Sequence, residues 1–74
     1  FNSTFILKQS DLFAERLRGE AKDEAGQIRR AFERVYGRQP DAEELNASTT
    51  LVQAHGLPAL CRALFNANEF LYLH

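Results

Sequence analysis

Helical periodicity, interrupted at intervals by glycine or proline, is the feature that most constrains what this chain can fold into. Apolar residues recur with the 3.6-residue period of an α-helix in four segments, which Gly19, Gly37 and Gly56 separate from one another. The connections between the segments are short, so consecutive helices are expected to be neighbours running in opposite directions. The sequence therefore predicts an all-α fold: a compact antiparallel four-helix bundle-like domain with a short C-terminal helical turn.

The first predicted helix covers about residues 3–18, with Asn2 as its N-cap and Gly19 as its end. Phe1 is expected to pack on Ile6 as a hydrophobic staple. The inward stripe is predicted to consist of Ile6, Ser10, Phe13 and Leu17.

The second predicted helix covers about residues 23–36 and ends at Gly37, which Pro40 follows shortly after. The third begins at Asp41, which forms a capping box with Glu44, and should stop at Gly56. The predicted inward residues of these two helices are Ile28, Ala31, Phe32, Val35, Tyr36, Leu45, Ser48, Leu51 and Val52.

The fourth predicted helix starts at Leu57-Pro58, because proline is well tolerated in a first helical turn. Its stripe is formed by Leu57, Leu60, Cys61, Leu64 and Phe65. The sequence Asn66-Ala67-Asn68-Glu69 has the spacing of a second capping box, so Asn66 is expected to end this helix and to start a short final turn. That turn would bring Phe70 and Tyr72 or Leu73 back onto the core, where one buried aromatic side chain stabilises by about 1.5–3 kcal/mol.

Size and composition narrow the class of protein. The 74 residues are interpreted as a single helical domain, 1–74, excised from the C-terminal end of a larger protein, since Phe1 is not a natural start. A net charge of −1 argues against a nucleic-acid-binding module, and no apolar stretch approaches the roughly 20 residues of a membrane span. Cys61 is the single cysteine and cannot form an internal disulfide.

Reactive groups are few, and the sequence predicts no catalytic residue, no metal ligand and no cofactor. His55 and Cys61 fit a helix end and an apolar core, respectively. Arg38 follows a predicted helix end, where its guanidinium is expected to bond free carbonyls and a carboxylate such as Glu44 or Glu69. The other arginines near it alternate with acids, which is typical of a solvated face with weak ion pairs.

Three segments, read together, resemble a known family. "FNSTF", "IRRAFERVYGRQPDAEEL" and "LCRALFNANEFLYLH" occur in this order and resemble the C-terminal part of planctomycete-specific domain one, a domain of unknown function in multidomain, often cytochrome-c-associated proteins. The resemblance implies an exported, periplasmic or cell-envelope protein and carries over no catalytic residues. The positions that match its pattern are Asn2, Arg38, Pro40, Glu44, Asn66, Asn68, Glu69 and Phe70.

Three functions stay open at this point. The first is a non-catalytic structural or interaction module that contacts other domains of the parent chain or a protein partner. The second is a fragment of an enzyme whose site is completed by upstream residues, with Arg38, His55 and Glu69 as possible donors to that site. The third is a free-standing helical module that binds nucleic acid or a helix. The sequence leaves the oligomeric state open.

Overall fold

The computed structural model describes the backbone of residues 3–72 and the side chains of residues 3–67. This part of the chain forms four α-helices: α1 (Thr4–Glu20), α2 (Glu24–Tyr36), α3 (Ala42–His55) and α4 (Leu57–Tyr72). No strand is present within residues 3–72. The predicted all-α, bundle-like fold is confirmed.

The ends of α2 and α3 lie where the sequence places them. Asp23 caps α2 by accepting a 2.7 Å hydrogen bond from the backbone N–H of Gly26, and Gly37 ends the helix in the left-handed conformation with φ 72°. Asp41 and Glu44 form the complete capping box at the start of α3. Gly56, with φ 92°, ends α3.

The predicted ends of α1 were wrong by one or two residues. Ser3, not Asn2, is the N-cap, because its hydroxyl accepts a 3.2 Å hydrogen bond from the Ile6 N–H. At the other end the helix passes through Gly19 and stops when Ala21 turns extended. Gly19 has no positive φ, and a glycine inside a helix costs only about 1 kcal/mol relative to alanine. The predicted Phe1 staple lies outside the described residues.

The predicted break at Asn66 was also wrong, since α4 continues without interruption to Tyr72. A cap at Asn66 would require its side-chain oxygen to accept a hydrogen bond from a following N–H. Among the described residues, that oxygen is instead buried without a hydrogen-bond partner. The sequence after Pro58 contains no glycine or proline that would stop the helix, so the closing residues form its last turns rather than a separate turn.

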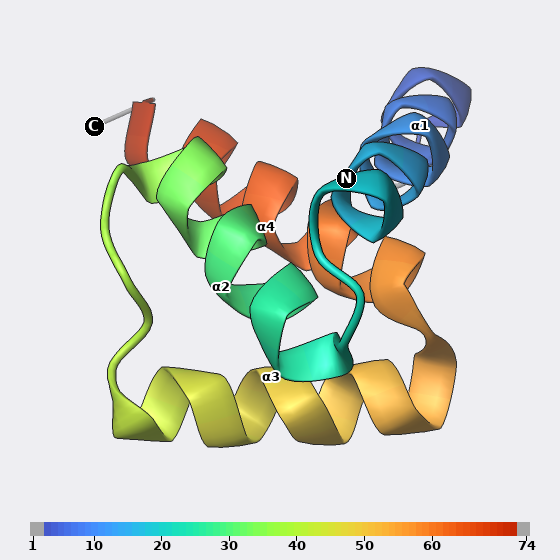
Figure 1. Cartoon of the computed structure of the whole chain (residues 1–74). Helices are drawn as coiled ribbons and strands as arrows, with labels where there is room; N and C mark the ends of the chain where they lie inside the picture. Colours follow the sequence, from blue (N-terminus) through green and yellow to red (C-terminus); the bar gives the residue numbers. More distant parts are fainter. Residues whose placement is uncertain (1–2, 73–74) are drawn as a thin grey trace.

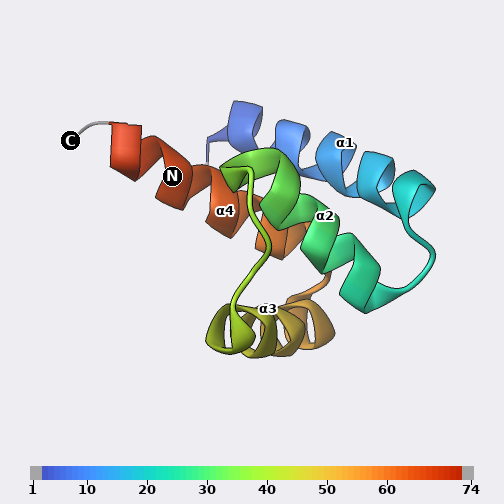
Figure 2. The ribbon, with the colours of Figure 1, turned by 60° about the vertical axis from the view of Figure 1, so that its left-hand side comes forward.

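Figure 1 and Figure 2 both show α2 and α4 running in the same direction, with α1 and α3 crossing them. Both α2 and α4 are in contact with α1. Figure 1 shows α3 lying across one side of α2 and α4, away from α1. Every consecutive pair of helices is in contact, as the short connections predict, and α3 does not contact α1 within the described residues.

The core is formed where α1, α2 and α4 meet. Ala14, Leu17, Ile28, Ala31 and Cys61 are fully buried. Other buried or half-buried apolar residues surround them: Phe13, Phe32, Val35, Tyr36, Leu45, Leu51, Val52, Leu57, Leu60 and Leu64. The predicted stripes of α2, α3 and α4 are confirmed, and α1 contributes Ala14 in addition to its predicted residues.

Two serines complete the packing. Ser10 is buried in α1 and satisfies its hydroxyl by donating to the Ile6 carbonyl at 2.7 Å. Ser48 is the buried residue of α3, where a small side chain allows close approach to the helices above it. Both serines were predicted to face inward, because position within the helical period outweighs polarity when the side chain is small.

Candidate docking surface

The residues singled out around Arg38 serve the fold. The Arg38 guanidinium donates two hydrogen bonds to the Glu44 carboxylate, at 2.7 and 2.8 Å, and one to the Gln39 carbonyl at 3.1 Å. The Glu44 carboxylate also accepts the Asp41 N–H at 2.9 Å. These bonds hold the pKa of Glu44 down at about 2. The predicted contact between Arg38 and Glu44 is therefore confirmed. Pro40 lies half-buried in the connection between α2 and α3, which this contact spans.

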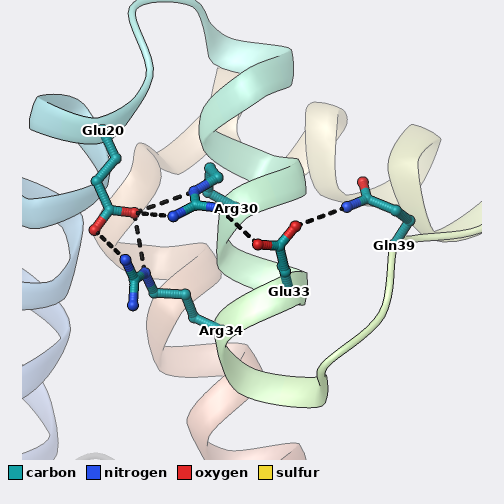
Figure 3. A network of polar contacts seen from close by, with 5 residues as sticks. All are labelled: Glu20, Arg30, Glu33, Arg34 and Gln39. Atoms are coloured by element: carbon teal, nitrogen blue, oxygen red, sulfur yellow. Dashed lines mark hydrogen bonds and ion pairs between the residues drawn. The ribbon is translucent and has the colours of Figure 1, made fainter.

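A second polar network ties the end of α1 to α2 (Figure 3). The Glu20 carboxylate accepts hydrogen bonds from Arg34 at 2.7 and 3.0 Å and from Arg30 at 3.2 Å. Arg30 also bonds Glu33 at 2.6 Å, and Glu33 accepts from Gln39. Arg34 is the main cause of the lowered pKa of Glu20. Arg30 and Arg34 are thus engaged with carboxylates, as the alternation of charges predicts.

The described part of the chain holds no cluster of three metal-ligating side chains. Cys61 is fully buried, and burial raises the pKa of its thiol to about 12, so the thiolate that a nucleophile requires does not form near neutral pH. Within residues 3–72 no helix has both the length and the apolar character of a membrane span. His55 is exposed in the last turn of α3.

Among residues 3–67, whose side chains the structure describes, the large exposed apolar side chains all lie on α1. Phe5 is 68% exposed, Leu12 53% and Leu7 39%. Leu12 borders a shallow depression of about 310 Å³ whose other walls are Gln9, Phe13, Arg16 and Phe65.

An aromatic pair lines this depression. The rings of Phe13 and Phe65 stack with their centroids 5.4 Å apart, which joins α1 to α4. On its far side the surface continues into a second depression of about 370 Å³, which Val35 and Arg34 of α2 complete. We call the surface formed by Phe5, Leu12, Phe13, Arg16 and Phe65 the α1 face.

A second apolar groove lies between α3 and α4. Phe32, Leu51, Leu60 and Leu64 line it together with small residues, namely Ala47, Ser48, Ala63 and Ala67. Its large side chains belong to the core, so it offers mainly alanine methyl groups to a partner. The α1 face exposes a phenylalanine and a leucine outright and is the stronger candidate for a docking surface.

The exposure of Phe5 and Leu12 was not predicted from the sequence. A signal was present, because both lie off the predicted inward stripe of α1 and a helix can bury only one side. Of the residues predicted to matter near the C-terminus, Asn66 is half-buried in α4. Asn68, Glu69, Phe70 and Tyr72 belong to the last turns of α4, but their side chains lie outside the described residues, as does all of Leu73.

Comparison with protein-family models, with curated proteins and with solved structures gives no match for this chain.

Proposed function

We propose that this chain is a non-catalytic helical module that acts by protein contact, through the α1 face. The observation that carries the proposal is the exposure of Phe5 and Leu12, at 68% and 53%, together with the depression that Leu12 and the stacked Phe13 and Phe65 rings line. Removing apolar surface from water stabilises by roughly 25 cal/mol per Å². Large side chains in this position add little to the fold itself, and their burial by a partner would favour association.

The composition of the α1 face supports docking of a protein rather than of a small molecule. Interface cores are enriched in aromatic residues and arginine, and Phe13, Phe65 and Arg16 lie together here. The depressions are shallow and open, whereas small ligands are usually held in enclosed pockets. The buried, unreactive Cys61 and the engagement of Arg38 with Glu44 support a non-catalytic role.

The wider setting of the module rests on the sequence resemblance. The "NANEFLY" segment and the other matching motifs support a place in a larger, exported or envelope-associated protein. In such a protein the α1 face would contact another domain of the parent chain or a separate protein.

Photocrosslinking in the native host tests the docking proposal. A photoreactive amino acid replaces Leu12 in the full-length parent protein, and a control places the same group at Ala54, which is exposed on α3. We expect position 12 to give one discrete crosslinked product, either between proteins or within the parent chain, that position 54 does not give. Equal, diffuse labelling from both positions would overturn the proposal.

A further inference from the structure

The outer side of α1 carries a regular stripe of its own. Phe5, Lys8, Leu12, Glu15 and Gly19 follow one another at steps of three, four, three and four residues, which places them on one line along the helix. All five are exposed. The stripe lies opposite Ser10, Ala14 and Leu17, which are buried against the other helices.

This stripe is complementary to itself in the antiparallel direction. If a two-fold axis passes through Leu12, each residue before Leu12 lies level with the one equally far after it in the second copy. Lys8 then lies one residue from the level of Glu15 of the second copy, and Glu15 lies equally close to Lys8 of that copy. Two symmetric ion pairs flank a central contact between the two leucines.

The remaining pair of the stripe fits as well. Phe5 lies level with Gly19 of the second copy, since both are seven residues from Leu12. Space is open at Gly19, where nothing lies within 4 Å of the position that a Cβ would occupy. An aromatic ring can therefore lie directly on the bare backbone.

The charges on the stripe are available for such pairing. Within the described residues, the ion pairs of this chain join Arg30, Arg34 and Arg38 to Glu20, Glu33 and Glu44. Lys8 and Glu15 take part in none of these pairs. Arg16, which would lie level with Lys8 of the second copy, belongs to the depression beside Phe65 and lies off the stripe.

We propose that a second copy of this chain binds antiparallel along the Phe5–Gly19 stripe, which shares Phe5 and Leu12 with the α1 face, with the two-fold axis at Leu12. This inference rests on the proposed docking function and names its partner. The stripe extends over about 21 Å, since Phe5 and Gly19 are 14 residues apart on α1 and each residue rises 1.5 Å. One such helix pair buries less than the ~1,200 Å² of a standard interface, so the dimer is weak and depends on concentration.

Sedimentation velocity on the full chain, from about 10 µM to about 1 mM, tests the proposal. We expect the unmodified chain to shift from monomer to dimer over this range. Leu12→Glu places two like charges on the two-fold axis and should abolish the shift. Leu7→Glu changes a leucine on a different side of α1 and should leave it intact. Thermal melts verify that both variants remain folded.

A charge exchange distinguishes this antiparallel contact from other modes of association. Lys8→Glu alone, or Glu15→Lys alone, replaces two attractive pairs with two repulsive ones and should weaken dimerisation about fivefold to thirtyfold. The double variant Lys8→Glu/Glu15→Lys restores both pairs and should return the affinity to within about twofold of the original.

A chain that stays monomeric throughout, or a double variant weaker than either single one, would overturn the second copy as the occupant. These outcomes are separable from failure of the docking function itself. A discrete crosslink from position 12 to a different protein would leave the α1 face as a docking surface and refute only the dimer.

Discussion

Arg38 and Glu44 join the end of α2 to the beginning of α3 through two parallel hydrogen bonds, of 2.7 and 2.8 Å. The same carboxylate closes the capping box with Asp41. The guanidinium of Arg38 also lies 5.4 Å from the centre of the Tyr36 ring, within range of a cation–π contact. One ion pair thus connects a helix end, a helix start and an aromatic ring.

Replacement of Arg38 by alanine is expected to lower the melting temperature by a few degrees. The change removes the paired hydrogen bonds and the contact with Tyr36, although the exposure of the pair limits the effect. Arg38→Lys keeps the charge but not the two-pronged geometry and should recover only part of the loss. Differential scanning calorimetry measures the three proteins, and equal melting of wild type and Arg38→Ala would contradict the structural role.

Stability should fall in acid as Glu44 takes up a proton. The pKa of Glu44 is lowered from 4.5 to about 2 in the folded chain, so the unfolded chain binds protons more readily between these values. The stabilisation is complete above about pH 4.5 and is lost as the pH falls toward 2. Urea unfolding at pH 6, 4 and 3 measures it, with Glu44→Gln as the matched control. If both proteins lose stability equally, Glu44 is not responsible.

Truncation of Leu17 to alanine should be close to the limit that the domain tolerates. Leu17 is fully buried, and a change of this kind costs about 2–5 kcal/mol. A core of this size yields a net stability of roughly 3–5 kcal/mol. We expect Leu17→Ala to be partly or wholly unfolded at 37 °C by circular dichroism. Leu7→Ala, at a 39% exposed position on the same helix, should melt close to wild type.

The thiol of Cys61 should be unreactive while the chain is folded. Its side chain is inaccessible and burial raises its pKa to about 12, so both access and thiolate formation are suppressed. A disulfide reagent at pH 8 is expected to label it only at the rate at which the domain unfolds. Labelling that is as fast as in urea would show that the core opens readily.

Much of the fold follows from local sequence, and the exceptions have physical causes. Asp41 with Glu44, and Gly37, were predicted correctly because their hydrogen bonds and backbone angles involve near neighbours only. The predicted helix break at Asn66 was wrong, because a capping-box spacing does not interrupt a helix when the residues on both sides favour helix. The crossing of α3 over α2 and α4 depends on how side chains of separate helices pack, and the helical period contains no information on crossing angle.

The docking surface is even less accessible from sequence. The inward stripe of α1 was predicted, but periodicity does not show that Phe5 and Leu12, on its other side, remain exposed among the described residues of the folded chain. The stacking of Phe13 on Phe65 joins residues that lie far apart in the sequence. The helical period predicts that each ring faces inward, but it does not predict that the two rings stack on each other.

The contact between α1 and α4 has a consequence for synthesis on the ribosome. Leu17 and Ala14 have their places in the core only when α4 is present, because Leu57, Leu60, Cys61 and Leu64 belong to the same cluster. A nascent chain that has released α1, α2 and α3 still lacks these side chains. The apolar side chains of α1, α2 and α3 therefore stay uncovered until α4 leaves the exit tunnel, and chaperone contact is expected during that interval.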